Sequence, residues 1–274
     1  MSLETRAAMP LDYQLVSYPG SALRFRGPAV DLSSPYVLCI GGTETFGRFI
    51  PAPYPAQLAV RIGVPVCNMG VTNAGLDAAL DDPAIAIAAR SASAIVLQLS
   101  GAHNTSNAFY AVHPRRNDRF VKASPMLSDL YREVDFTQFH FTRHLLSHLK
   151  ALGGARFDML REELQMTWRS RILGFLATAD APVHLLWLAR RAPETPEPEE
   201  GLGADPLFVT RAMLDDVSGN AASLSVVAEP GARGASATRG MFFSRREEAA
   251  ARVLPGPQAH EAACAALVGR LGPV

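Results

Sequence analysis

Two hydroxyl groups follow the first strongly hydrophobic stretch of the sequence. Residues 36–40 are apolar and rich in β-forming side chains, and two glycines end this run before Thr43 and Thr45. The pattern predicts a buried strand that is followed directly by a turn. In an open α/β sheet, the loop after a central strand is where chemistry is usually placed. Thr43 and Thr45 are therefore the first candidates for reactive hydroxyl groups.

Other residues with useful chemistry lie at the ends of later elements. Gly70 ends the second apolar run, His103 and Asn104 follow the third, and His260 lies near the start of the last predicted helix. An imidazole can accept a proton from a hydroxyl nucleophile, and backbone amides can stabilise an oxyanion. Any joint chemistry of these groups requires the sheet to bring these distant segments together.

The elements that must position these residues alternate between strands and helices. Strand, helix, strand, helix and strand follow one another within about 70 residues, which is typical of a parallel sheet. The apolar runs predict strands at 36–40, 64–69, 94–99, 183–189 and 224–228. Apolar residues at helical spacing predict helices at 56–63, 76–91, 139–152, 157–177, 206–217 and 258–271.

The length of 274 residues favours a single domain over residues 1–274. Within it, residues 1–34 lack sustained periodicity and are expected to form an N-terminal arm. Residues 103–179 are expected to form an insertion, which starts with a long polar loop at 103–133. Its second half is a predicted αα-hairpin, joined at two glycines, whose role as a lid, a dimer surface or a packed insertion the sequence leaves open.

Composition excludes several classes of partner. Lys plus Arg and Asp plus Glu both total 26, so the formal net charge is zero and no global field attracts nucleic acid or an anionic membrane. No apolar run reaches the ~18–20 residues that a membrane span needs. The first 15 residues carry charges and a proline and do not resemble a signal peptide. Three cysteines, an odd count in apolar sequence, favour a reducing cytoplasm.

Four short segments together resemble the SGNH, or GDSL-type, hydrolase superfamily. They are GGTETFG at 41–47, NMGVT at 68–72, GAHN at 101–104 and PQAH at 257–260. The resemblance implies a three-layer α/β/α fold with a mainly parallel five-stranded sheet in flavodoxin-like strand order. It also implies hydrolysis of an acyl ester or an O-acylated carbohydrate, without a metal or another cofactor.

The resemblance also implies roles for individual residues. Thr43 corresponds to the nucleophile and His260 to the base that takes its proton. The amide of Thr43 would stabilise the oxyanion, and the remaining positions implied in oxyanion or substrate binding are Gly42, Gly70, His103 and Asn104.

The sequence departs from the superfamily pattern at several of these positions. Thr43 replaces the usual serine and adds a methyl group beside the attacking oxygen. His103 stands at the position of the usual asparagine, and Pro257 at that of the aspartate that orients the histidine. In serine proteases, replacing the orienting aspartate lowers turnover roughly 10⁴-fold. In this chain a backbone carbonyl or Glu229 would have to orient the histidine instead.

These departures keep two functions open. The first is an atypical SGNH-like esterase that uses Thr43 and His260. The second is a catalytically inactive scaffold that binds a glycan or a protein partner through the same cleft. Threonines in such a turn also commonly cap the following helix, and a histidine at a helix start can be an ordinary polar residue. The sequence leaves open whether the protein forms a homo-oligomer.

Two further clusters of residues are better interpreted as structural than as functional. His140, His144 and His148 recur every four residues along one predicted helical stripe, but no carboxylate completes a metal site, and phenylalanine and leucine neighbours indicate a boundary face. A basic cluster in the long loop could hold a phosphate or a sugar acid, although a solvated surface is the simpler interpretation. Its members are Arg115, Arg116, Arg119 and Lys122.

Overall fold

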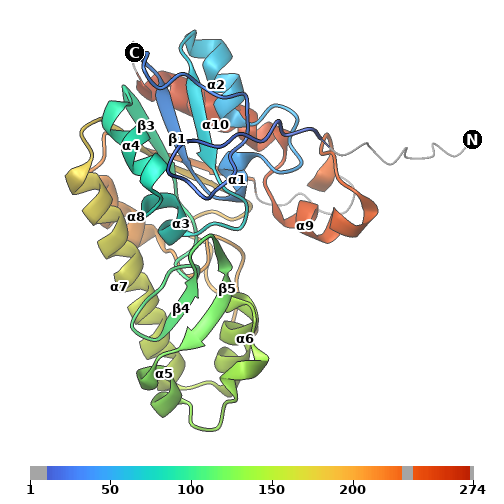
Figure 1. The fold of residues 1–274 in the computed structure, drawn as a ribbon. Coiled ribbons are helices and arrows are strands. Elements are labelled where there is room, and N and C mark those ends of the chain that lie inside the picture. Colours follow the sequence, from blue (N-terminus) through green and yellow to red (C-terminus); the bar gives the residue numbers. More distant parts are fainter. Residues whose placement is uncertain (1–10, 230–236, 272–274) are drawn as a thin grey trace, which may run out of the picture.

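The computed structural model describes residues 11–229 and 237–271 (Figure 1). Its centre is a parallel sheet of five strands in the order β2-β1-β3-β6-β7, which confirms the predicted flavodoxin-like order. The strands are β1 (Val37–Gly41), β2 (Val66–Gly70), β3 (Ala94–Gln98), β6 (Val183–Ala189) and β7 (Ser223–Ala228).

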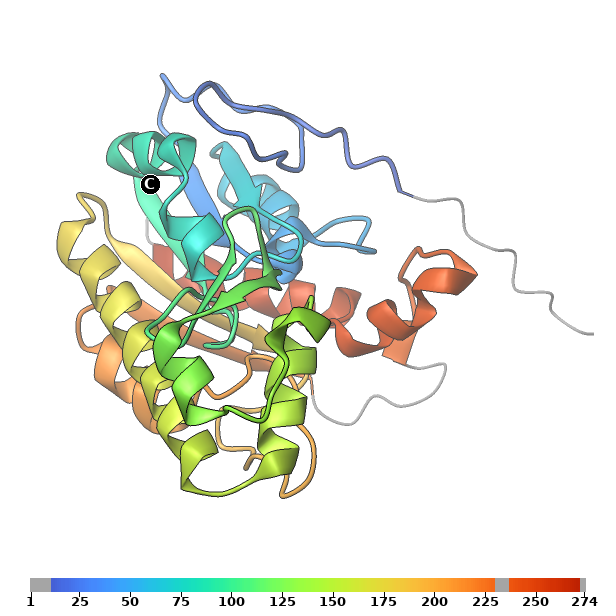
Figure 2. The same ribbon diagram turned by 60° about the horizontal axis from the view of Figure 1, so that its bottom comes forward.

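Helices cover both faces of this sheet, as the three-layer prediction requires (Figures 1 and 2). Successive side chains of a strand point to opposite faces, so Val37 and Cys39 of β1 pack with one layer and Leu38 and Ile40 with the other. One layer contains α2 (Tyr54–Ile62) and α10 (Pro257–Leu271). The other contains α3 (Leu76–Leu80), α4 (Pro83–Ser91), α7 (Ala155–Thr178) and α8 (Arg211–Ser218).

The single helix predicted at 76–91 is two helices, so this prediction was wrong. The Asp82 side chain accepts hydrogen bonds from the amides of Ala84 and Ile85, at 2.9 and 3.2 Å, and therefore caps a new helix. Pro83 occupies the first position of α4, where its missing N–H costs nothing. The helix expected from 206 likewise begins at Arg211, after the side chain of Thr210 caps it.

The segment expected to be a long polar loop is mostly regular structure. It contains the antiparallel pair β4 (Tyr110–His113) and β5 (Arg116–Ala123), followed by α5 (Pro125–Leu130). Buried and partly buried residues alternate in β4, and Phe120 of β5 is buried beside it. The short 3₁₀ helix Phe136–Gln138 and α6 (Thr142–Leu152) complete the first half of the predicted insertion.

Two short helices complete the fold near the turn after β1. The turn itself forms α1 (Thr43–Phe46), and the connection after β7 contains α9 (Glu248–Val253), preceded by a 3₁₀ turn at Arg245–Glu247. A small apolar cluster joins these segments and includes Phe49, Ile50, Met241 and Ala251. The sequence analysis did not predict α9.

The described part of the N-terminal segment is attached to the same region. Phe25 is fully buried, and the guanidinium of Arg26 donates to four carbonyls that follow or end α1, those of Phe46, Gly47, Ile50 and Pro51. Residues 1–10 of the predicted arm lie outside the described residues. Among the helices of the described ranges, none combines the length and hydrophobicity needed to cross a bilayer.

Asn117 connects the β4–β5 pair to the layer formed by α3. Its buried side chain accepts hydrogen bonds from the amides of Gly75 and Ala78, at 2.7 and 3.0 Å, and donates to the carbonyl of His113. These amides belong to the first turn of α3, where no earlier carbonyl of the helix is available. Asn117 therefore caps α3 from a strand that lies about 40 residues later in the sequence.

We expect Asn117→Ala to destabilise the protein by roughly 2–3 kcal/mol, because two buried amides lose their acceptor. Asn117→Asp keeps an acceptor oxygen for both amides, loses only the hydrogen bond to the His113 carbonyl, and should cost less. The measurement is urea unfolding followed by circular dichroism. Asn220→Ala, in an exposed turn, is the matched control and should change little. Equal stability of the Asn117→Ala variant and the wild type would contradict the capping role.

Candidate active site

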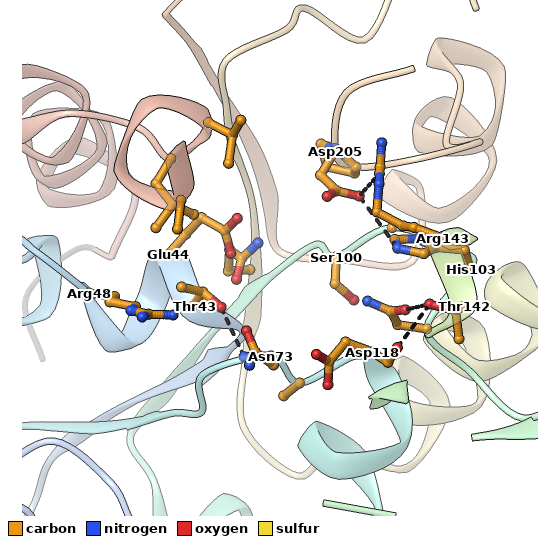
Figure 3. Close-up of a pocket in the computed structure, with 18 of the residues that line it drawn as sticks. Thr43, Glu44, Arg48, Asn73, Ser100, His103, Asp118, Thr142, Arg143 and Asp205 are labelled. Atoms are coloured by element: carbon orange, nitrogen blue, oxygen red, sulfur yellow. Dashed lines mark hydrogen bonds and ion pairs between the residues drawn. The ribbon is translucent and has the colours of Figure 1, made fainter. Parts of the chain in front are cut away.

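A cavity of about 390 Å³ lies where β1 and β3 end, within the size range of small-molecule sites (Figure 3). Its walls come from α1, the turn after β2, the turn after β3, β5, the start of α6, the segment around residue 205 and α9. Figure 3 shows Thr43 and Glu44 on one side and His103 and Arg143 on the other, with Ser100 pointing toward the space between them.

Thr43 lies in this cavity, and its closest backbone partner is a residue that the sequence analysis missed. The Thr43 Oγ1 atom accepts a hydrogen bond from the amide of Asn73 at 2.9 Å (Figure 3). Asn73 has φ of +59°, a left-handed conformation that asparagine tolerates better than most residues. An asparagine two positions before a glycine, just after a predicted strand, is the signal that could have found it.

The amides of Gly42 and Gly70 already have partners. Gly42 donates to the Gln98 side chain at 2.8 Å, and Gly70 donates to the side chain of Asn68 at 2.9 Å. Neither glycine lines the cavity. A Cβ atom at Gly70 would lie 2.3 Å from the backbone nitrogen of Phe46, so this position needs glycine for close packing against α1. The amide that faces Thr43 is that of Asn73, not the expected one of Gly70.

His260 is engaged by Tyr54 in the interior and is not among the residues that line the cavity with Thr43. It is 1% exposed, does not line the cavity, and its Nδ1 accepts the backbone N–H of Tyr54 at 3.2 Å. The imidazole also stacks on the Tyr54 ring, with centroids 6.1 Å apart. Burial lowers the pKa of His260 to about 3, so it is neutral at physiological pH. Glu229, the alternative orienting group, instead accepts the amide of Gly256 at 2.8 Å.

Thr45 is part of the interior. Its side chain is fully buried, and Oγ1 lies 3.0 Å from the Tyr54 hydroxyl and donates to the Gln98 side chain at 3.3 Å. These contacts hold the turn after β1 from its interior side, and Thr45 does not line the cavity.

His103 and Asn104 both line the cavity, and Figure 3 shows His103 across from Thr43. His103 is 2% exposed, its Nε2 lies 3.7 Å from a carboxylate oxygen of Asp205, and burial lowers its pKa to about 4. Its Nδ1 is buried and makes no hydrogen bond with the described residues. The Asn104 side chain accepts a hydrogen bond from the Thr142 hydroxyl at 2.6 Å.

Sequence reasoning also missed three polar residues of the cavity. Burial raises the pKa of Glu44 to about 7, and it raises the pKa of Asp118 as well. Ser100 Oγ and Asp118 Oδ1 are buried and, within the described ranges, have no hydrogen-bond partner. Asp118 comes from β5, which the sequence analysis treated as irregular loop, so no pattern pointed to it.

The structure also places the histidine stripe and the basic cluster. Among the described residues, no group of three or more His, Cys, Asp or Glu side chains could hold a metal ion. The rings of His144 and His148 pack on Phe139, with centroids 4.9 and 5.2 Å apart. None of the four basic side chains at 115–122 lines the cavity, and Arg119 lies over the ring of Phe141.

Comparison with known families finds one match over the whole chain. The model of the family described as "Domain of unknown function (DUF6473)" matches residues 1–274. A search of curated protein sequences found no match.

Solved structures with a similar arrangement include two acetyl xylan esterases. One is Est2A from Butyrivibrio proteoclasticus, with 13% identity and a TM-score of 0.44 over 90% of this chain and 65% of that chain. The other is a catalytic mutant of Axe2 from Geobacillus stearothermophilus, with 14% identity and a TM-score of 0.43 over 86% of this chain and 94% of that chain. This chain thus spans about two thirds of the length of Est2A.

The buried, neutral state of His260 predicts a pH dependence of stability. Its pKa is about 3 in the folded chain and 6.5 when exposed, so its contribution is fully present above pH 6.5 and is lost as pH falls. Between about pH 7.5 and about pH 5 this loss amounts to about 2 kcal/mol. The glutamine of His260→Gln cannot take up a proton. The free energy of unfolding of this variant should therefore fall by about 2 kcal/mol less than that of the wild type over the same pH interval.

Urea unfolding at both pH values measures this difference. His140→Gln, at an exposed position, is the matched control and should follow the wild type. If His260→Gln and the wild type lose the same stability on acidification, His260 does not titrate as its burial predicts.

Proposed function

The chain belongs to the family described as Domain of unknown function (DUF6473), and from the geometry of its cavity we propose that it binds a small polyhydroxylated molecule of carbohydrate type. In this proposal the protein is an SGNH-like scaffold that does not hydrolyse its ligand through Thr43 and His260.

The observation that carries the proposal is a set of buried polar atoms without partners. Ser100 Oγ, His103 Nδ1 and Asp118 Oδ1 belong to residues of one cavity, and within the described part of the chain none of them makes a hydrogen bond. Buried polar atoms in native proteins are nearly always hydrogen-bonded, so these atoms favour a ligand with several hydroxyl groups. The side chain of Phe141 adds an aromatic surface at the same cavity.

The proposal of binding without hydrolysis rests on the position of the imidazole. A general base must reach the proton that it removes. The Nδ1 of His260 is already the acceptor of the Tyr54 amide, and His260 lies outside the cavity that contains Thr43. His103 is in the cavity, but a pKa of about 4 makes it a weak base at neutral pH.

One observation favours acyl-ester hydrolysis as a second candidate. Thr43 Oγ1 lies against the amide of Asn73, so an oxyanion formed by attack at this position would lie near a backbone donor. Glu44, the next residue, also lines the cavity, and a pKa of about 7 suits a general base. In this candidate Glu44 takes the role that the sequence resemblance implies for His260.

Binding is tested by saturation-transfer NMR with glucose, xylose and glucosamine. We expect transfer to at least one of these sugars, and its loss in Ser100→Leu, because the larger side chain fills the cavity and cannot donate to a hydroxyl. Ser91→Leu, at an exposed helix end, is the matched control and should leave the signal unchanged. The absence of transfer to all three sugars in the folded wild-type protein would refute the proposed function.

Hydrolysis is tested with p-nitrophenyl acetate and acetylated xylo-oligosaccharides. We expect the wild type, Thr43→Val and Thr43→Ser to show the same background rate. If the second candidate holds instead, Thr43→Val should lower the rate roughly 100-fold or more, while Thr43→Ser should retain activity. Thermal unfolding of each variant shows whether loss of the Asn73 contact affects folding.

A further inference from the structure

The arginines that line the cavity are already engaged by protein groups. Arg48 pairs with Glu247 at 2.9 Å. Arg143 lies 3.3 Å from Asp205 and also donates to the carbonyl of Gly203 at 2.6 Å (Figure 3). His103 adds no positive charge, because burial keeps it neutral near pH 7. The positive charge of the cavity is therefore compensated before any ligand enters.

Two carboxyl groups of the cavity are compensated weakly or not at all. No described cation lies within ion-pair distance of Glu44. Asp118 has one long ion pair, with 3.9 Å between its Oδ1 and Arg116 Nε, which is beyond hydrogen-bond range. Asp118 Oδ1 is one of the buried atoms without a hydrogen bond, and Ser100 Oγ, which lines the same cavity, is another. Partial burial of a carboxylate with only one long ion pair is costly, and a cation that enters the cavity reduces this cost.

We propose that the ligand of this cavity is a hydroxylated primary amine of amino-sugar type, whose ammonium group is held by Asp118 and Ser100. This inference rests on the proposed function and names the chemical class of its ligand. The carboxylate of Asp118 accepts from the ammonium, and so does the hydroxyl oxygen of Ser100. The hydroxyl groups of the ligand are left for His103 and for the opposite wall at Thr43 and Glu44.

The same charges argue against an anionic ligand. A phosphate or sugar acid would face Glu44, Asp118 and Asp205, while both arginines of the cavity are paired with carboxylates. The exposed basic cluster at 115–122 does not alter this balance inside the cavity, because none of its side chains forms part of the lining.

Isothermal titration at neutral pH with three sugars of the same ring tests the amine. Glucosamine carries an ammonium group, N-acetylglucosamine has the same nitrogen as a neutral amide, and glucose has a hydroxyl in its place. We expect glucosamine to bind roughly tenfold or more tightly than the other two, because a hydrogen bond between charged groups is stronger than a neutral one.

Asp118→Asn should abolish this preference. Asp118 Oδ1 accepts no hydrogen bond from the described residues, and the change keeps the size of the side chain, so the variant should fold; thermal unfolding checks this. Asp129→Asn, at an exposed carboxylate on α5, is the matched control and should keep the preference for glucosamine. Weak glucose binding should persist in both variants.

The outcomes separate the two proposals. If glucose and glucosamine bind equally and Asp118→Asn changes neither affinity, the proposed recognition of an ammonium group is refuted, while the proposed binding of a polyhydroxylated ligand still holds. If glucosamine is preferred but Asp118→Asn keeps the preference, the assignment to Asp118 is overturned. If none of the three sugars binds to the folded wild type, the proposed function fails and this inference fails with it.

Discussion

The buried carboxamide of Gln98 attaches the turn after β1 to the end of β3. Its Oε1 accepts from the amide of Gly42 and the hydroxyl of Thr45, and its Nε2 donates to the carbonyl of Leu99. The side chain is 2% exposed, so no water can replace these contacts readily. A Cβ atom at Gly41 would lie 2.6 Å from the same oxygen, and glycine is therefore required there. The position of α1, and with it one wall of the cavity, depends on this contact.

The same buried network explains the place of His260. The Thr45 hydroxyl meets the Tyr54 hydroxyl, and the backbone N–H of Tyr54 donates to the imidazole. His260 thus connects α10 to the start of α2 as a hydrogen-bond acceptor. A neutral imidazole has a single basic nitrogen, and in His260 this is the Nδ1 that accepts the backbone N–H of Tyr54, so it is not free to take a proton from a nucleophile.

Hydrophobic pattern predicted the sheet well because each central strand is buried on both faces and appears as a continuous apolar run. It failed where local side-chain chemistry decides the outcome, as at Asp82, whose cap divides one periodic segment into two helices. The hairpin β4–β5 was missed because β4 has only four residues, and because β5 carries four charged side chains and buries only Asn117 and Phe120. Of the predicted site residues, Thr43, His103 and Asn104 line the cavity. The amides of Gly42 and Gly70 are already bonded to side chains, which no sequence pattern could show.

The missed hairpin contributes a carboxylate because of how it is anchored. Neighbouring residues of a strand direct their side chains to opposite faces. In β5, Asn117 is fully buried and caps α3, so Asp118 must face the other way, and there it forms part of the cavity. The Thr142 hydroxyl also donates to the Asp118 carbonyl at 3.3 Å, which connects the strand to α6. An apolar side chain at Asp118 would leave this anchoring intact, so the fold does not require a carboxylate there. A buried carboxylate oxygen that accepts no hydrogen bond from the described residues is better explained by what the cavity binds.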